Sequence, residues 1–319
     1  MPLVVLGEVR TCLLPSAAAL ARDEAGELLA LMPGRAVRWR ERPGSLGVSP
    51  TTAVGVDCDL PLGAETARIV GTVATSIALT GGRVLQSSAH TRVQRAAERR
   101  RQTWSHYISQ KGVTEVITRI PERETAGSLF AETYLTQPPE AKHLDLASIS
   151  ERQLARVRAD PRLDQNPPVQ AGTTRLRWAA RIGGSAGPTA TLHLNDDTVR
   201  SVRLILRDES DIAAAQRFCE DLAAHDWLLT VLAGALDEAD RYPPHSRERM
   251  DILAPALEHL SGLWMPGAHT PPVLRALWKD FQNDPGFTKQ WTTLTGRLRD
   301  NIAVATLHAL RHKVFDTDW

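Results

Sequence analysis

The sequence predicts an α+β protein, in which an N-terminal antiparallel β-rich part with short helices precedes a C-terminal α-helical bundle. Two observations predict this class. Before residue 207, several segments alternate apolar and polar residues with the two-residue period of a strand. After residue 208, apolar residues recur at the three- and four-residue spacings of helices. We therefore expect a β-rich α+β domain over residues 1–207, and a helical domain or subdomain packed on it over residues 208–319.

The first elements alternate between strand and helix. Residues 4–14 are a mostly apolar run, which predicts a strand. Ser16 is suited to cap a short helix, and Pro33-Gly34 would end that helix. Residues 36–42 alternate as in a half-exposed strand.

A hairpin over residues 69–95 is the clearest local prediction. Gly81-Gly82 can supply the positive φ angles that a tight two-residue turn requires. The two-residue period of the second strand then predicts two faces. One face carries Gln86, Ser88, His90 and Arg92, and the other carries Leu85, Ala89 and Val93.

The middle of the chain predicts connecting structure followed by more strands. Residues 121–172 are rich in polar turns, with one helix expected over residues 148–160. Alternating residues within 173–207 predict a second β block, with a turn at residues 195–197.

From residue 210 onward the sequence predicts helices. Ser210 is suited to cap the first, and Pro255 would kink or divide the second, expected over residues 246–264. The last helix begins near Pro285 and carries a core-facing apolar stripe from Phe287 to Ala309. Four tryptophans of this part are expected to anchor its core, or else to line an aromatic groove for a partner: Trp227, Trp264, Trp278 and Trp291.

The composition indicates a globular cytoplasmic protein. Of the 319 residues, 42% are hydrophobic and 24% are charged, which is unlike a disordered chain. The three cysteines form no close pair, as is typical of reduced thiols. The longest charge-free apolar stretch, between Arg68 and Arg83, is about 14 residues, whereas a membrane helix needs about 20. We therefore expect a cytoplasmic location and no membrane partner.

Charge is unevenly distributed along the chain, although the formal net charge is only +1. Residues 1–120 carry fifteen Lys/Arg and ten Asp/Glu, whereas residues 208–319 carry eleven Lys/Arg and seventeen Asp/Glu. This distribution predicts either two outer faces of opposite sign or two halves that complement each other across an internal interface.

The strongest local feature is a basic segment, residues 83–111, with seven Lys/Arg and one acid. Arginine offers paired donors to phosphate or carboxylate, and aromatic faces can stack on bases. A solvated loop that serves only solubility would have the same composition, and residues 96–102 suit either a short helix or such a turn. The candidate binding residues are His90, Arg92, Arg95, Arg99, Arg100, Arg101, Trp104 and His106. A second cluster, Arg35, Arg38, Arg40 and Arg42, would extend this surface if the two segments are neighbours.

We assign no catalytic residue, metal ligand or cofactor from the sequence. No GxGxxG, GxxxxGK[ST], HExxH or CxxC pattern occurs. Asp221 and His225 lie four residues apart on a predicted helix. They suit a proton-transfer couple, because a carboxylate can hold an imidazole in one tautomer, or a simple helix contact worth about 0.5 kcal/mol.

Several stretches resemble a full-length family of actinobacterial-type hypothetical proteins. They include LGEVRTCLLP at 6–15, GTVATSIALTGGRVLQSSAHTRV at 71–93, WSHYI at 104–108, TRLRWAA at 174–180, LAAHDWLLTVL at 222–232, LWMPGAH at 263–269 and PGFTKQW at 285–291. Members of this family are encoded near a variant P-loop protein and a methyltransferase. The resemblance therefore implies a multi-component cytoplasmic system, and it implies no particular reaction or cofactor.

Three hypotheses of function follow. The first is a non-enzymatic cytoplasmic component that binds a protein partner, within an assembly that contains a P-loop protein. The second is a nucleic-acid- or phosphate-binding module that uses the basic segment. The third is an enzyme of unrecognised type around His90 and Arg92.

Overall fold

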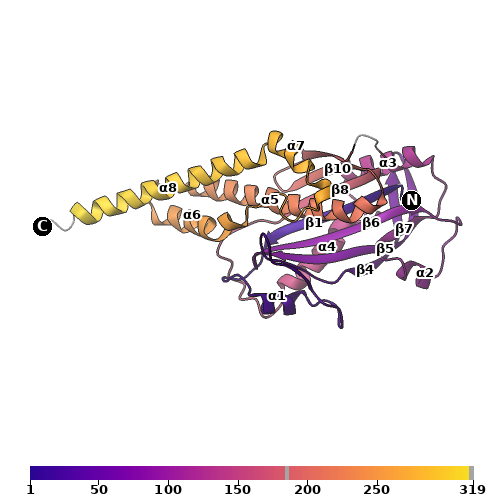
Figure 1. The fold of residues 1–319 in the computed structure, drawn as a ribbon, viewed down its shortest axis with the longest axis horizontal. Helices are drawn as coiled ribbons and strands as arrows, with labels where there is room; N and C mark the ends of the chain where they lie inside the picture. The colour runs from indigo at the N-terminus through magenta and orange to yellow at the C-terminus, as the bar shows by residue number, and fades with distance from the viewer. Residues whose placement is uncertain (184–186, 316–319) are drawn as a thin grey trace.

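A mixed ten-stranded sheet forms the centre of the fold (Figure 1). The computed structural model describes residues 1–183 and 187–315. Its strands are β1 (Val4–Leu13), β2 (Arg38–Arg40), β3 (Leu46–Val48), β4 (Thr52–Leu62), β5 (Glu65–Thr80), β6 (Val84–Arg95), β7 (Val113–Val116), β8 (Thr174–Ile182), β9 (Thr189–Leu194) and β10 (Val199–Leu206). Its helices are α1 (Arg22–Leu29), α2 (Trp104–Ile108), α3 (Arg123–Thr136), α4 (Leu146–Arg158), α5 (Ile212–Ala239), α6 (Arg247–Leu260), α7 (Leu277–Asn283) and α8 (Phe287–Phe315).

The α+β class is confirmed, since the N-terminal half is mostly strand and the C-terminal part is helical. The expectation of an antiparallel sheet is wrong in part. Strand β10 pairs with β8 in parallel, and β7 pairs with β6 in parallel. The first parallel pair arises because the chain runs through the edge strand β9 before it returns beside β8.

The predicted hairpin is β5 and β6, joined by Gly81-Gly82 with φ angles of +59° and +65°. The central strand β1 pairs antiparallel with both β6 and β8. Strand β7 pairs with both β5 and β6, beyond the residues through which these two strands pair with each other. On its other edge, β5 pairs with β4 along most of its length and with β3 near its end, and β2 pairs with β3.

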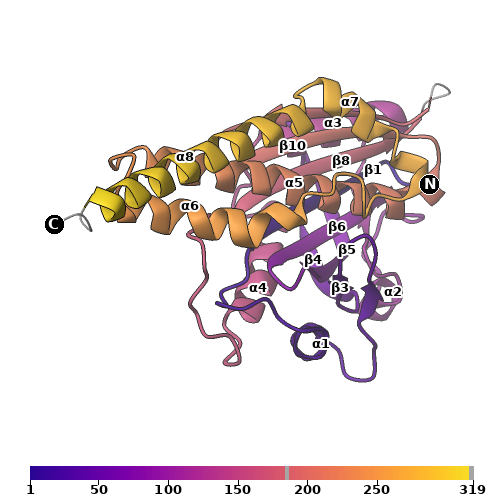
Figure 2. The same ribbon diagram turned by 60° about the vertical axis from the view of Figure 1, so that its left-hand side comes forward.

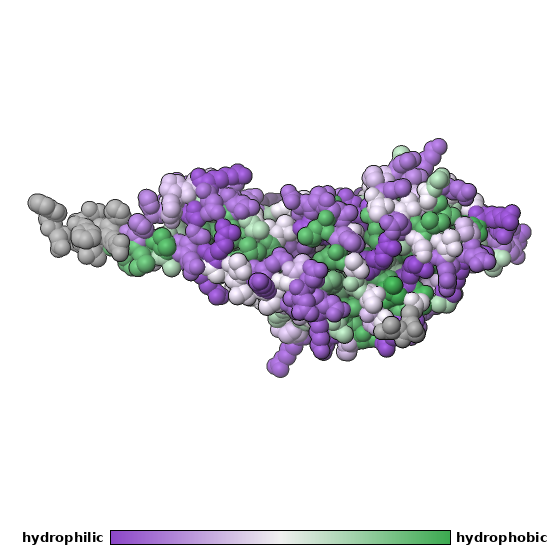
Figure 3. All heavy atoms as spheres, turned by 90° about the horizontal axis from the view of Figure 1, so that it is seen from above, coloured by the Kyte–Doolittle hydropathy of each residue, from purple (hydrophilic) through white to green (hydrophobic). Residues whose placement is uncertain are grey.

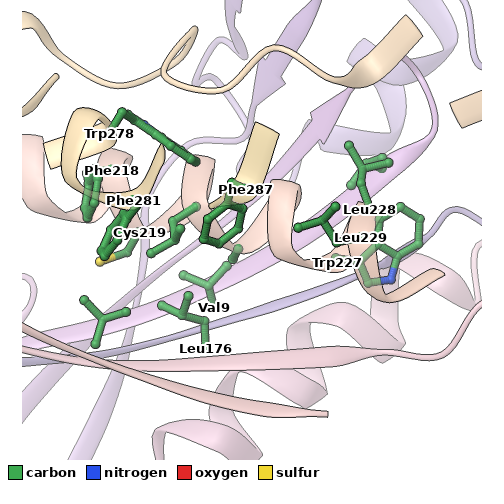
Figure 4. Close-up of a cluster of buried hydrophobic side chains, with 14 of the residues drawn as sticks. Val9, Leu176, Phe218, Cys219, Trp227, Leu228, Leu229, Trp278, Phe281 and Phe287 are labelled. Carbon is green, nitrogen blue, oxygen red and sulfur yellow. The ribbon is translucent and has the colours of Figure 1, made fainter. Parts of the chain in front are cut away.

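Helices cover both faces of the sheet (Figure 2). Helices α3 and α4 pack on one face, where Leu6 and Phe130 are fully buried. Helix α5 packs on the other face and contacts β1, β6, β8 and β10. In this second layer Val9 and Leu176 of the sheet meet Phe218, Trp227 and Phe287 of the helices, as Figure 4 shows.

Several predicted boundaries differ from the structure. Helix α1 begins at Arg22 rather than after Ser16, which is buried before the helix starts. Asp208, not Ser210, caps the turn that precedes α5, because its side chain accepts the Ser210 N–H. Helix α6 continues through Pro255 without dividing.

Helix α3 was not predicted, and it lies within residues 121–172, where connecting structure was expected. Its buried residues do not form a clean stripe, because the helix contacts β1, β4, β8 and β10. Among the described residues, no helix is both long and apolar enough to cross a bilayer.

Gly7 of β1 is required by close packing against β8. Gly7 lies opposite Trp178, which is only 1% exposed, and a Cβ at Gly7 would lie 2.2 Å from Trp178 Cε2. We expect Gly7→Ala to lower the free energy of unfolding by about 3 kcal/mol, because the buried indole has to shift. Chemical denaturation measures this change.

Gly234→Ala is the matched control for that measurement. Gly234 lies within α5, and a Cβ there meets no atom within 4 Å. Alanine is the better helix former by about 1 kcal/mol, so this variant should be as stable as the wild type or more so. Equal unfolding midpoints for Gly7→Ala and wild type would contradict the packing argument.

Candidate functional site

A cavity lies between the sheet and the first half of α5. Its volume is about 20 Å³, which is room for about one water molecule. Leu46, Val84 and Leu263 are among its apolar walls. Its polar lining consists of Thr80, Gln86, Arg217, Glu220, Asp221, His225 and His269. The cavity therefore brings together β6, α5 and the segment that follows α6.

The polar face of β6 forms the floor, as the two-residue period predicted. Ser88 Oγ donates to Glu220 Oε1 at 2.7 Å, and Gln86 Nε2 donates to the Glu220 backbone oxygen at 2.8 Å. Glu220 is 5% exposed and also accepts from Gln216 at 2.9 Å and from Arg217 at 2.6 Å. A buried carboxylate is stable only when charge and hydrogen bonds compensate it, so this set anchors α5 on the sheet.

His225 is held neutral in one tautomer. Its Nδ1–H donates to the Asp221 backbone oxygen at 2.7 Å, and its Nε2 accepts the Met265 N–H at 3.0 Å. Burial lowers the pKa of His225 to about 4. Because both ring nitrogens are occupied, His225 fixes the segment around Met265 and has no nitrogen left to exchange a proton with a ligand.

Asp221 and His269 have unsatisfied polar atoms. Thr270 Oγ1 donates to Asp221 Oδ2 at 2.7 Å, and Trp278 Nε1 donates to Thr270 Oγ1 at 2.9 Å. Among the described residues, Asp221 Oδ1 accepts no hydrogen bond and neither buried ring nitrogen of His269 has a partner.

Burial shifts these two groups in opposite directions. It raises the pKa of Asp221 to about 6, against the opposing effect of its bonds and of His269. It lowers the pKa of His269, against the attraction of Asp221, while the charges of Arg40 and Arg217 lower it further. The cavity thus favours the neutral form of both side chains.

His90 lies on the same face of β6 but does not line this cavity. Gly7 separates His90 from Trp178 in the sheet, and the two rings stack across it at 6.4 Å between centroids. The Nδ1 of His90 is buried without a partner among the described residues, and burial lowers the pKa of His90 to about 4.

The remaining predicted site residues lie on and after the end of β6. Arg92, Arg95, Arg99, Arg100 and Arg101 are all exposed. The segment 96–103 forms no helix, so the solvated turn is the correct alternative, and α2 follows it.

Two acidic groups and one carbonyl oxygen already engage arginines of this basic segment. Arg101 pairs with Asp57 at 3.0 Å and lies over the half-exposed Trp104 ring, with 5.4 Å to its centroid. Arg100 pairs with Glu98 at 2.5 Å, and Arg95 donates to the Pro121 oxygen at 2.8 Å.

The Nε2 atom of His106 lies 3.0 Å from Oε1 of Glu115, a residue of β7. In the described part of the chain, none of the eight predicted residues lines the cavity. Polyanion binding by the basic segment stays a prediction.

The cavity residues Arg217, Glu220 and His269 were not predicted from the sequence. Gln86 carried a signal, since the strand period placed it on a polar face. His269 has no local signal, because its environment is set by α5 and by the strands on which α5 packs.

One sequence pattern is typical of a catalytic serine. Residues 183–187 match GxSxG, the pattern of a nucleophile at a strand-to-helix turn. Residues 184–186 lie outside the described part. The pattern falls between β8 and β9, hence between two strands, which is the wrong context for that nucleophile.

Comparison of the chain with protein-family models, with curated proteins and with solved structures finds no match.

The titration of His225 gives a test of the site. In the unfolded chain histidine protonates near pH 6.5, whereas burial lowers the folded pKa to about 4. Wild type therefore loses stability as the pH falls from 6.5 towards 4. His225→Leu lacks this loss, although it should be destabilised at pH 7 by about 2 kcal/mol because the Met265 N–H loses its acceptor.

We therefore expect the stability difference between wild type and His225→Leu to shrink by about 2 kcal/mol between pH 6.5 and 4.5. The raised pKa of Asp221 acts in the opposite direction, and Asp221 is present in both chains. Denaturation across this pH range measures the effect. A difference that stays constant would show that His225 titrates normally in the folded protein.

Proposed function

We propose that this chain is a non-enzymatic cytoplasmic component that binds a protein partner through the projecting end of α8. The observation that carries the proposal is an apolar seam on that helix. Val304, Leu307 and Leu310 are 44%, 58% and 55% exposed. Figure 3 shows hydrophobic side chains at the surface where α8 leaves the body of the protein.

The seam lies opposite the face of α8 that packs on the body. Leu298 and Ala305 are buried, and α8 contacts α5 and α6. At 100° per residue, Leu307 lies about 160° around the helix from Ala305. One face of α8 is thus used inside the protein, and the other carries exposed apolar residues with no internal partner among those described.

The spacing of the seam suits a partner helix. Leu307 and Leu310 of the seam, with the exposed Ala303 before them, follow the four- and three-residue steps of a coiled coil, and Val314 continues these steps in the sequence. The side chains of Ala309 and of residues 311–315 lie outside the described part, so the stripe predicted to reach Ala309 is described only to Ala305.

The net positive charge of the last part of α8 favours a partner of opposite charge. Residues 299–315 carry three Lys/Arg (Arg299, Arg311 and Lys313) and one acid, Asp300. By sequence, a second copy of α8 would bring two stretches of the same net charge together, whereas an acidic amphipathic helix would carry the opposite charge. The family resemblance suggests a P-loop protein of the same system as the bearer of that helix.

The two alternatives have less support. The hypothesis of nucleic-acid binding by the basic segment has less support, because Arg100 and Arg101 already pair with Glu98 and Asp57. The hypothesis of an enzyme around His90 has less support, because the ring stacks on the buried Trp178 and does not line the cavity.

The double substitution Leu307→Asp and Leu310→Asp tests the seam. We expect it to weaken partner binding at least about tenfold, because it places charge at the centre of an apolar contact. It should change the free energy of unfolding by no more than about 0.5 kcal/mol, since both side chains are exposed. The matched control is Ile108→Asp with Leu194→Asp, which are 60% and 62% exposed elsewhere on the protein.

A photo-crosslinking residue at position 307, expressed in the native host, identifies the occupant, with position 108 as its control. Mass spectrometry should map the crosslink to an acidic amphipathic segment of another protein, and the double aspartate variant should lose that protein. Crosslinks only to a second copy, or none above the level of position 108, would reject the proposal.

A further inference from the structure

Strand β9 has an open outer edge that its sequence does not protect. It ends the sheet on one side and, among the described residues, pairs only with β10. The edge strands on the other side carry features by which proteins prevent unwanted strand pairing. Strand β2 is three residues long and carries Arg38 and Arg40 of the second arginine cluster. Strand β4 carries Asp57, Asp59 and Pro61. The six residues of β9, TATLHL, include no Lys, Arg, Asp, Glu or Pro.

Backbone groups of alternate β9 residues point outward from this edge. Just beyond β9, the Asn195 N–H donates to the Val199 oxygen at 3.0 Å, so these two residues form a hydrogen-bonded pair. In an antiparallel ladder such pairs alternate with pairs that are not hydrogen-bonded to each other. The backbone N–H and C=O groups of Ala190, Leu192 and Leu194 therefore point away from β10. Among the described residues, no other backbone group of the chain bonds to them.

The side chains of the same three residues face α5. Leu194 lies opposite Arg200, whose Nε donates to Asp226 of α5 at 3.1 Å. Directly paired residues of antiparallel strands share a face, and alternate residues of one strand point to the same side. A strand added beside Ala190, Leu192 and Leu194 would thus place every second side chain on the side of the helical layer.

An open groove lies next to the Leu194 end of β9 and has a volume of about 650 Å³. It is bounded by Leu194, by α5 and by the first turns of α8, and its walls include Leu229, Phe287 and Leu294. Leu194 itself is 62% exposed. The groove therefore continues the open edge with an apolar surface.

The charges that line the groove favour a basic occupant. Arg200 and Asp226 neutralise each other, since they pair at 3.1 Å. Two further acids, Asp197 and Asp237, and one base, Lys289, also line the groove. None of these three makes an ion pair with another described residue. A second copy of β9 would bring no Lys or Arg to this groove, whereas a basic segment would complement its excess of acid.

From these observations we infer a second docking site, independent of the seam on α8. An extended segment of a partner protein pairs with β9 as an added strand. Its inward side chains are apolar along Ala190, Leu192 and Leu194, and a Lys or Arg beyond them meets Asp197 and Asp237 in the groove. Main-chain hydrogen bonds supply the affinity in this mode of recognition, and the groove supplies the sequence preference.

Selection of random twelve-residue peptides displayed on phage tests this site, with the full chain as the target. Peptides that also bind Ala190→Pro are removed. This substitution deletes one outward N–H and no bond to β10, a position where edge strands tolerate proline. We expect the retained peptides to alternate apolar and polar residues and to carry a Lys or Arg near one end. Retained peptides with helical three- and four-residue spacing, or no retained peptide, overturn the inference.

Fluorescence anisotropy then measures the affinity of one retained peptide. Ala190→Pro should weaken binding at least about tenfold, whereas the matched control Ala190→Ser, which keeps the N–H, should stay within about twofold of wild type. N-methylation of one alternate set of peptide residues should abolish binding and N-methylation of the other set should not, because an added strand directs every second N–H towards β9. Equal effects of the two methylated sets would show that the peptide does not add as a strand.

The charge preference has its own variants. Asp197→Asn/Asp237→Asn should weaken the basic peptide at least about fivefold at low salt. The matched control Glu65→Gln/Glu122→Gln removes two acids elsewhere and should stay within about twofold of wild type. Equal losses in the two double variants overturn the assigned groove. All four carboxylates are exposed, so these variants are expected to fold, and thermal unfolding verifies this for them and for Ala190→Pro.

The two docking surfaces are tested separately. Ala190→Pro should leave the crosslink at position 307 unchanged, and the double aspartate variant of α8 should leave peptide binding at β9 unchanged. Failure of one proposal is thus distinguishable from failure of the other.

Discussion

The buried carboxylate of Glu220 is the interaction on which the arrangement of the protein depends. A strand whose inward face carries Gln86 and Ser88 cannot be covered by an apolar helix without leaving those groups unsatisfied. Helix α5 solves this by presenting Glu220, which accepts from Ser88, Gln216 and Arg217 at 2.6 to 2.9 Å. Since α6 and α8 pack on α5, the position of the whole helical layer follows from this polar junction as well as from the apolar core beside it.

Beside this junction, the surroundings change from buried to solvent-exposed over a short distance. Inside the cavity, burial lowers the pKa of His225 and raises that of Asp221, so uncharged groups are favoured. Beside the cavity, the exposed Arg38 and Arg40 line a second hollow, which also includes Arg217 and His269. His269 lines both spaces, and neither of its buried ring nitrogens has a hydrogen-bond partner among the described residues.

Helix α8 shows how one element serves two environments. Most helical stability in proteins comes from packing of an amphipathic face, and isolated helices are marginal in water. The first part of α8 has that packing through Phe287 and Leu298, whereas Leu307 and Leu310 are exposed. A partner helix would supply to the projecting end the packing that α5 and α6 supply to the rest.

The amino-acid sequence alone determined the local and periodic features of this protein. The α+β class, the β5–β6 hairpin and the polar face of β6 follow from two-residue alternation and from Gly81-Gly82, which act over a few neighbouring residues. Helix α3, the parallel pairing of β8 with β10, and the cavity were decided only by the tertiary structure. Leu46, Glu220 and His269 line this cavity although they are far apart in the chain, and no local pattern connects them. Their proximity results from strand register and from the packing of α5, and burial then sets their chemistry.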